Sequence, residues 1–167
     1  RLLTGSVTSP TLASQLSQLL AEFPAMKWHQ YEPAGRDEVR EGARLAFGEY
    51  VDVHYRLNQA QVVVALDADP LGSGPNSLRY AREFAELRRV TGGRREMCRL
   101  YAIEQTPSVT GFAADHRLPA SAGSVGPFAL ALAAALGIPG AASAPVSPEA
   151  ASWIDPVARD LQAHRGS

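Results

Sequence analysis

The sequence lacks both a surplus of positive charge and any long apolar run, and each absence excludes a class of protein. Its 167 residues contain 16 Lys and Arg against 17 Asp and Glu, so the formal net charge is −1. A domain that binds DNA or RNA needs a basic face for the phosphates, so we expect no nucleic-acid partner. No run of about 18 apolar residues occurs, so we expect no direct insertion into a membrane.

Cysteine is nearly absent, which limits the redox and metal chemistry of the chain. Cys98 is the single cysteine, so no intramolecular disulfide can form, and the ligand spacings of iron–sulfur and zinc sites are missing. It lies in the strand-like stretch 97–103, where we expect a buried structural thiol rather than a nucleophile. The four histidines form no i, i+4 helical pair. We therefore predict no catalytic residue and no metal site.

An initiator methionine and a signal-like apolar segment are also missing at the start of the chain, Arg1 to Leu3. We expect a piece of a longer protein, with any targeting signal outside it. The hydrophobic content of 46% suffices for one core. We predict an α/β domain over residues 1–140. Residues 141–167 are expected to form a linker and a C-terminal helix that packs back on the domain or leads to the next one.

Short apolar runs alternate with helical patterns, which is typical of βαβ units. The prediction is a doubly wound, mostly parallel sheet in a Rossmann-like three-layer α/β/α fold. The expected strands are 2–4, 25–31, 50–55, 61–66 and 99–103, while 115–119 is too short to assign. Helices are expected after the N-cap Ser9, from Asp37 to Gly48, over 78–87 with Gly92-Gly93 at its end, over 127–136 with Gly137 at its end, and through Trp153, Val157 and Leu161.

The carboxyl ends of the predicted strands are the expected place for a ligand, since open parallel sheets bind ligands there. Gly5 allows a close backbone approach just before a helix N-terminus, which favours anions. The full glycine-rich nucleotide motifs are missing. The candidate cofactor-binding residues are Gly5, Ser6, Asp67, Asp69, Glu104 and Thr106. Ordinary strand-to-helix turns are the alternative. Asp67 and Asp69 could also hold Mg²⁺, although that spacing is common without a metal.

Two stretches resemble the pterin-dinucleotide-binding α/β domains of the molybdopterin oxidoreductase superfamily. There, one strand ends G-S-N-P, and a second proline follows after four residues. The stretch DADPLGSGP at 67–75 has both prolines at that spacing. The next strand of the family ends D-P-R-x-T-x-T-A-x-x-A-D-x-x-L. The stretch EQTPSVTGFAADHRL at 104–118 keeps the acid, the hydroxyls, the Ala-Asp pair and the leucine in register.

A narrower similarity rests on LTGSVTSPTL, FPAMKWHQYEP, LDADPLGSGP, LRYAREFA and EQTPSVTGFAADHRLP. These phrases resemble the TAT-variant-translocated molybdopterin oxidoreductase subunit of alternative complex III. The resemblance implies a respiratory quinol-oxidising electron-transfer complex at the periplasmic face of the bacterial cytoplasmic membrane. The implied partners are the remainder of the polypeptide and other subunits, with iron–sulfur clusters elsewhere in the full protein. It further implies a degenerate, non-catalytic domain that has lost the pterin and molybdenum.

The departures from the superfamily pattern agree with such a loss. Asp67 replaces the glycine of G-S-N-P, Asp69 replaces the asparagine, and Thr106 replaces the arginine of D-P-R. The crevice gains two carboxylates and loses a cation, which disfavours a pyrophosphate. Two alternatives stay open. One is a genuine molybdopterin guanine dinucleotide-binding domain of a molybdenum or tungsten oxidoreductase. The other is an unrelated nucleotide-binding α/β module.

Overall fold

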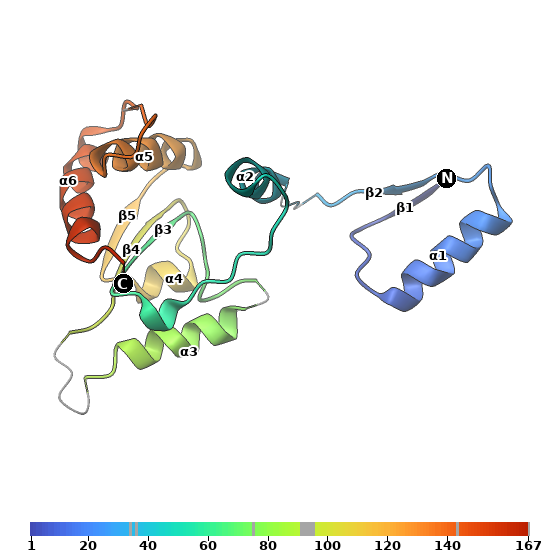
Figure 1. Cartoon of the computed structure of the whole chain (residues 1–167), viewed down its shortest axis with the longest axis horizontal. Coiled ribbons are helices and arrows are strands. Elements are labelled where there is room, and N and C mark those ends of the chain that lie inside the picture. Colours follow the sequence, from blue (N-terminus) through green and yellow to red (C-terminus); the bar gives the residue numbers. More distant parts are fainter. Residues whose placement is uncertain (34, 36, 75, 91–95, 143, 167) are drawn as a thin grey trace. The chain divides into compact units, whose positions relative to one another are not determined.

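The computed structural model describes residues 1–33, 35, 37–74, 76–90, 96–142 and 144–166 (Figure 1). The chain divides into two compact units, Arg1–Val53 and His54–Ser167. The domain boundary expected near residue 140 lies inside the second unit. The pair Gly92-Gly93, expected to end a helix, lies outside the described residues.

The first unit is a single βαβ element followed by a helix. Strand β1 (Leu2–Thr4) pairs in parallel with β2 (Trp28–Gln30), and α1 (Pro10–Glu22) connects them. The side chain of Ser9 accepts a hydrogen bond from the backbone N–H of Leu12, and proline occupies the first helical position. Both features favour a helix start, as predicted.

Helix α2 (Asp37–Phe47) ends the regular part of the first unit. Asp37 and Glu38 stand in its first turn, where negative charge complements the helix dipole. Gly48 follows with a φ of 82°, the left-handed conformation that glycine adopts without strain, so the predicted helix end is confirmed.

Two strand predictions are corrected. The expected strand at 25–31 is regular only over the three residues of β2. The expected strand at 50–55 is irregular, and its apolar residues Tyr50, Val53 and Tyr55 are exposed. Its alternating pattern suits a strand, but a strand forms only where a neighbour accepts its backbone hydrogen bonds. No such partner exists among the described residues.

The second unit contains a three-stranded parallel sheet in the order β3-β4-β5. The strands are β3 (Val62–Leu66), β4 (Arg99–Glu104) and β5 (His116–Pro119). The helices are η1 (Leu57–Gln59, a 3-10 turn), α3 (Ser77–Leu87), α4 (Val109–Ala113), α5 (Ala122–Ala135) and α6 (Pro148–Ala163). The stretch at 115–119, which was not assigned from the sequence, contains strand β5. Helix α4 is absent from the predicted elements, and α5 begins before the predicted start at Pro127.

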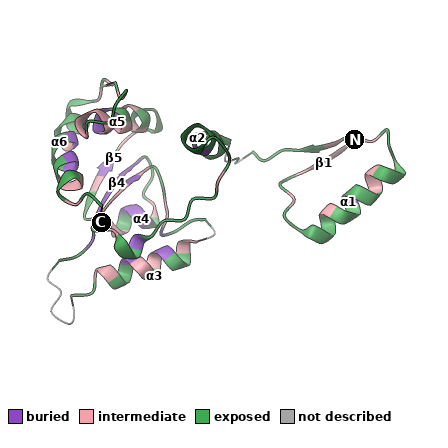
Figure 2. Cartoon of the chain, viewed as in Figure 1, coloured by how far each residue is buried: buried purple, intermediate pink, exposed green. Residues whose placement is uncertain are grey.

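Helices cover both faces of this sheet, so the unit has three α/β/α layers, and the predicted parallel α/β fold class is confirmed (Figures 1 and 2). On one face, Phe128 of α5 and Val157 of α6 pack against Ile103. On the other face, Phe84 of α3 packs with Leu100. Strand β4 is central and buried from its second residue onward, as a strand covered on both faces requires. Among the described residues, no helix is both long and apolar enough to cross a membrane.

Candidate functional site

Four of the six candidate residues lie at the carboxyl ends of neighbouring strands of the second unit, β3 and β4. The N–H of Asp67 donates to the carbonyl of Ile103 at 2.7 Å, so the two strand ends lie side by side. Asp67 and Thr106 are exposed, whereas Asp69 is half-buried and Glu104 is buried. Gly5 and Ser6 belong to the other unit, where they follow β1.

Asp67 adopts a backbone conformation that is unusual for its residue type. Its φ is 47°, and it is the one described residue other than glycine with a positive φ. A side chain in this region crowds its own backbone, while glycine adopts it freely and aspartate tolerates it better than most residues. The turn after β3 thus has the geometry of a glycine position, occupied by aspartate.

Asp69 is held by hydrogen bonds from the protein itself. Its Oδ1 accepts from Oγ1 of Thr110 at 2.7 Å, from N of Thr110 at 2.9 Å and from N of Gly72 at 3.2 Å. Thr110 is fully buried, and its Oγ1 in turn accepts from N of Leu71 at 3.0 Å. Burial disfavours ionisation of Asp69, but the hydrogen bonds from Thr110 and Gly72 outweigh it, and the pKa is lowered.

Glu104 is 3% exposed, and both of its carboxylate oxygens accept hydrogen bonds. Its Oε1 accepts from Nε of Arg117 at 2.6 Å and from N of Ser108 at 3.2 Å, and its Oε2 accepts from Oγ of Ser108 at 2.6 Å. Burial alone would raise its pKa, but Arg117 and Ser108 lower it below the usual value. A Cβ atom at Gly111 would overlap the Glu104 carboxylate, so α4 lies directly against this group.

At the β1 turn, a carboxylate of the same unit lies where an anion would bind. The backbone N–H of Ser6 donates to Oε2 of Glu32 at 3.2 Å, and a Cβ atom at Gly5 would lie 3.4 Å from that oxygen. The Glu32 carboxylate therefore lies beside the turn at Gly5 and Ser6 that was expected to favour an anion.

These contacts decide how well the edge of β3 and β4 suits an anionic dinucleotide. Pyrophosphates bind to free N–H groups and cations. Here the N–H of Ser108 and that of Thr110 donate to carboxylates, and the N–H of Gly111 donates to Oγ of Ser108 at 3.0 Å. Arg117, a cation at this edge, is paired with Glu104. The described residues of this edge thus fit a pyrophosphate poorly.

The Mg²⁺ alternative finds no support in the geometry. Within the described ranges, no three His, Cys, Asp or Glu side chains gather as metal ligands would. The Oδ1 atom of Asp69 already accepts three hydrogen bonds. Asp67 Oδ1 lies 3.5 Å from the N–H of Gln105, at the limit of a hydrogen bond.

Four residues that matter at this edge were not singled out from the sequence, namely Ser108, Thr110, Gly111 and Arg117. The hydroxyls of Ser108 and Thr110 are noticeable only through the family pattern at 104–118. Arg117 follows a histidine in a stretch too short to assign, and its pairing across strands carries no local signal. Gly111 shows its importance only when the Glu104 side chain is in place.

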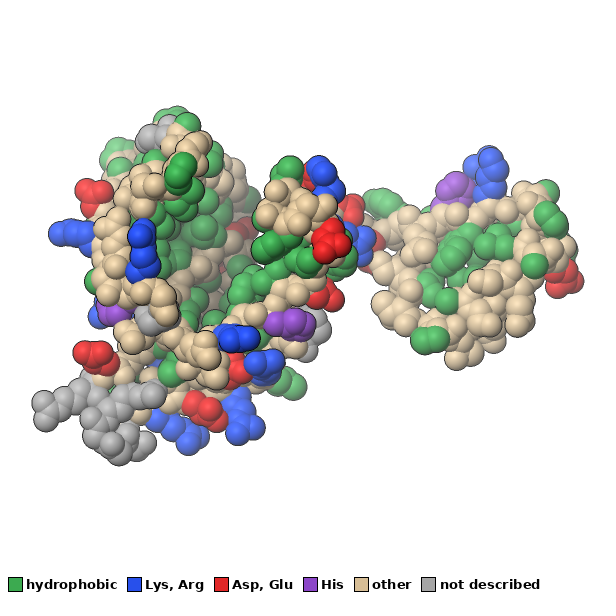
Figure 3. All heavy atoms as spheres, in the orientation of Figure 1, with side chains coloured by type: hydrophobic (Ala, Val, Ile, Leu, Met, Phe, Trp, Pro, Cys, Tyr) green, Lys and Arg blue, Asp and Glu red, His purple; other side chains and the backbone are tan. Residues whose placement is uncertain are grey.

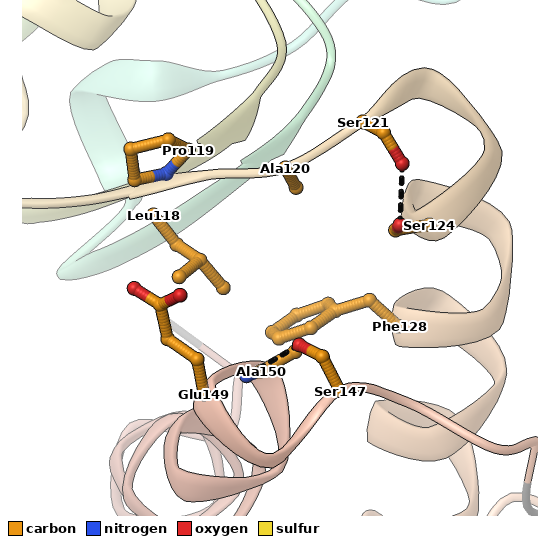
Figure 4. A pocket seen from close by; sticks show the side chains of 9 residues that line it. All are labelled: Leu118, Pro119, Ala120, Ser121, Ser124, Phe128, Ser147, Glu149 and Ala150. Atoms are coloured by element: carbon orange, nitrogen blue, oxygen red, sulfur yellow. Dashed lines mark hydrogen bonds between the residues drawn. The ribbon is translucent and has the colours of Figure 1, made fainter.

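A small cavity lies beyond the end of β5, between the N-termini of α5 and α6 (Figure 4). Its volume is about 120 Å³, which suits a few water molecules and is far smaller than a dinucleotide needs. Leu118 and Phe128 form its apolar floor. The rim serines bond within the protein: Ser121 and Ser124 contact each other at 2.6 Å, and Ser147 accepts from N of Ala150 at 3.2 Å.

Comparison with known proteins yields no match to any family model and no significant match among curated proteins.

Proposed function

We propose that this chain is a domain of a molybdopterin-oxidoreductase-like subunit of a respiratory quinol-oxidising complex, where it serves as a scaffold without pterin or metal. Its partners would be the rest of its own polypeptide and the other subunits of the complex, at the periplasmic face of the membrane. The proposal rests on the family resemblance at 67–75 and 104–118, together with the geometry of the same residues.

The conformation of Asp67 supports the family assignment. The glycine of the G-S-N-P motif aligns with Asp67, which has a φ of 47°. A left-handed residue at the aligned position is what a glycine of that motif would provide. The chain thus retains the left-handed turn of the motif, but aspartate replaces the glycine that would adopt this conformation without strain.

The scaffold function is supported by one observation. Backbone N–H groups at the edge of β3 and β4 already donate hydrogen bonds to the protein's own carboxylates. Asp69 binds the N–H groups of Gly72 and Thr110, and Glu104 binds that of Ser108. A cofactor phosphate would have to displace these bonds and approach two buried or half-buried negative charges. That approach is costly in a crevice of low dielectric.

Binding of guanosine diphosphate to this chain, followed by isothermal titration calorimetry, tests the proposal. We expect no binding tighter than a Kd of about 1 mM. The variant Asp67→Gly/Asp69→Asn restores the family residues and removes both charges, and it should bind more tightly than the wild type. The double variant Asp155→Asn/Glu96→Gln, at two exposed carboxylates, provides a matched loss of two charges away from the edge and should bind like the wild type. Micromolar binding by the wild type would contradict the scaffold function and favour a nucleotide-binding module.

The intact protein provides the second test. Molybdenum and tungsten are measured by mass spectrometry, and released pterin by fluorescence, on the full-length polypeptide purified from its native membrane. We expect neither the metal nor the pterin in stoichiometric amount. One equivalent of metal together with released pterin would favour a genuine molybdopterin guanine dinucleotide-binding domain instead.

A further inference from the structure

We draw no further inference here: the strongest candidate, the apolar outer edge of strand β3 at Val62–Leu66 in the second unit, carries none because nothing in the structure shows what covers it.

Discussion

Thr110 donates two hydrogen bonds to the same oxygen of Asp69, through Oγ1 at 2.7 Å and through its backbone N at 2.9 Å. The first residue belongs to α4 after β4, and the second to the turn after β3. The pair therefore joins the two strand-to-helix connections at the edge where a parallel sheet usually binds its ligand. In this chain, the polar groups of that edge bond to one another and connect the two loops.

Replacement of Thr110 by valine tests this structural role. Thr110→Val removes the hydroxyl that donates to Asp69 and accepts from N of Leu71, and it leaves a buried N–H without a partner. We expect the free energy of unfolding to fall by about 1–3 kcal/mol, measured by urea denaturation. Thr106→Val is the matched control. Thr106 is exposed, so this variant should change the stability by less than about 0.5 kcal/mol. Equal effects of the two variants would refute the role of Thr110.

Substitution of Gly111 by alanine tests the close packing of α4 on Glu104. The added Cβ overlaps the carboxylate, which is fixed by Arg117 and cannot move aside freely. We expect a loss of about 2–3 kcal/mol in the free energy of unfolding. Gly123→Ala in α5 is the control, because its Cβ meets nothing within 4 Å. That variant should be neutral or stabilising by up to about 1 kcal/mol. A neutral Gly111→Ala would mean that α4 does not lie against Glu104.

The left-handed conformation of Asp67 predicts a stabilising substitution. Asp67→Gly removes the steric cost of a positive φ, and we expect the free energy of unfolding to rise by about 0.5–1 kcal/mol. Asp67→Ala removes the same carboxylate but retains a Cβ, so it should not stabilise the chain. Thermal and urea unfolding of the two variants separate the effect of φ from that of charge. A gain shared equally by both variants would assign it to charge instead.

Much of the fold follows from local signals, and the errors occur where those signals are short. The start of α1 depends on Ser9 and the proline after it, which act within one turn, so it is predictable from sequence. The strand expected at 50–55 has a suitable pattern but no pairing partner among the described residues. Helix α4 has five residues, too few to show a helical period.

The candidate site was also predictable only in part from the sequence. The order of strands suffices to bring Asp67, Asp69 and Glu104 to one edge of the sheet. The pattern does not tell whether their carboxylates face a ligand or the protein. That depends on Thr110 and Arg117, whose side chains reach Asp69 and Glu104 only in the folded chain. Because Thr110 pairs with Asp69 and Arg117 pairs with Glu104, the carboxylates expected to line an acidic crevice are bonded within the protein.

The thiol of Cys98 should react slowly in the native protein. Cys98 is 4% exposed, and burial raises the pKa of its thiol, which Arg88 only partly offsets. Both effects reduce the accessible thiolate. We expect Ellman's reagent at pH 7.5 to react on the order of 100-fold faster in 8 M urea than with the folded chain. Rapid labelling of the folded chain would show that this thiol is accessible, contrary to its predicted structural role.

Acid should destabilise the chain through carboxylates that are ionised and bonded in the folded state. Hydrogen bonds from Arg88 lower the pKa of Asp115, and the pKa values of Asp69 and Glu104 are lowered as well. A folded pKa below the unfolded value, 3.8 for Asp and 4.5 for Glu, stabilises the folded chain above the unfolded pKa. That contribution disappears as the pH falls through the folded value. We therefore expect the free energy of unfolding to be nearly constant from about pH 7 to 5 and to fall steeply below about pH 4.5.

Replacement of Asp115 isolates one part of this acid sensitivity. Both oxygens of Asp115 accept from Arg88 at 2.7 Å, and one also accepts from N of Leu100 at 2.9 Å. Asp115→Asn should lower the stability at pH 7 and reduce the loss between about pH 4.5 and 2.5, because one group with a lowered pKa is gone. Glu149→Gln, at an exposed carboxylate, should leave the pH profile closer to that of the wild type. Urea unfolding at a series of pH values measures all three curves. An unchanged acid slope in Asp115→Asn would show that the pair with Arg88 does not contribute to acid unfolding.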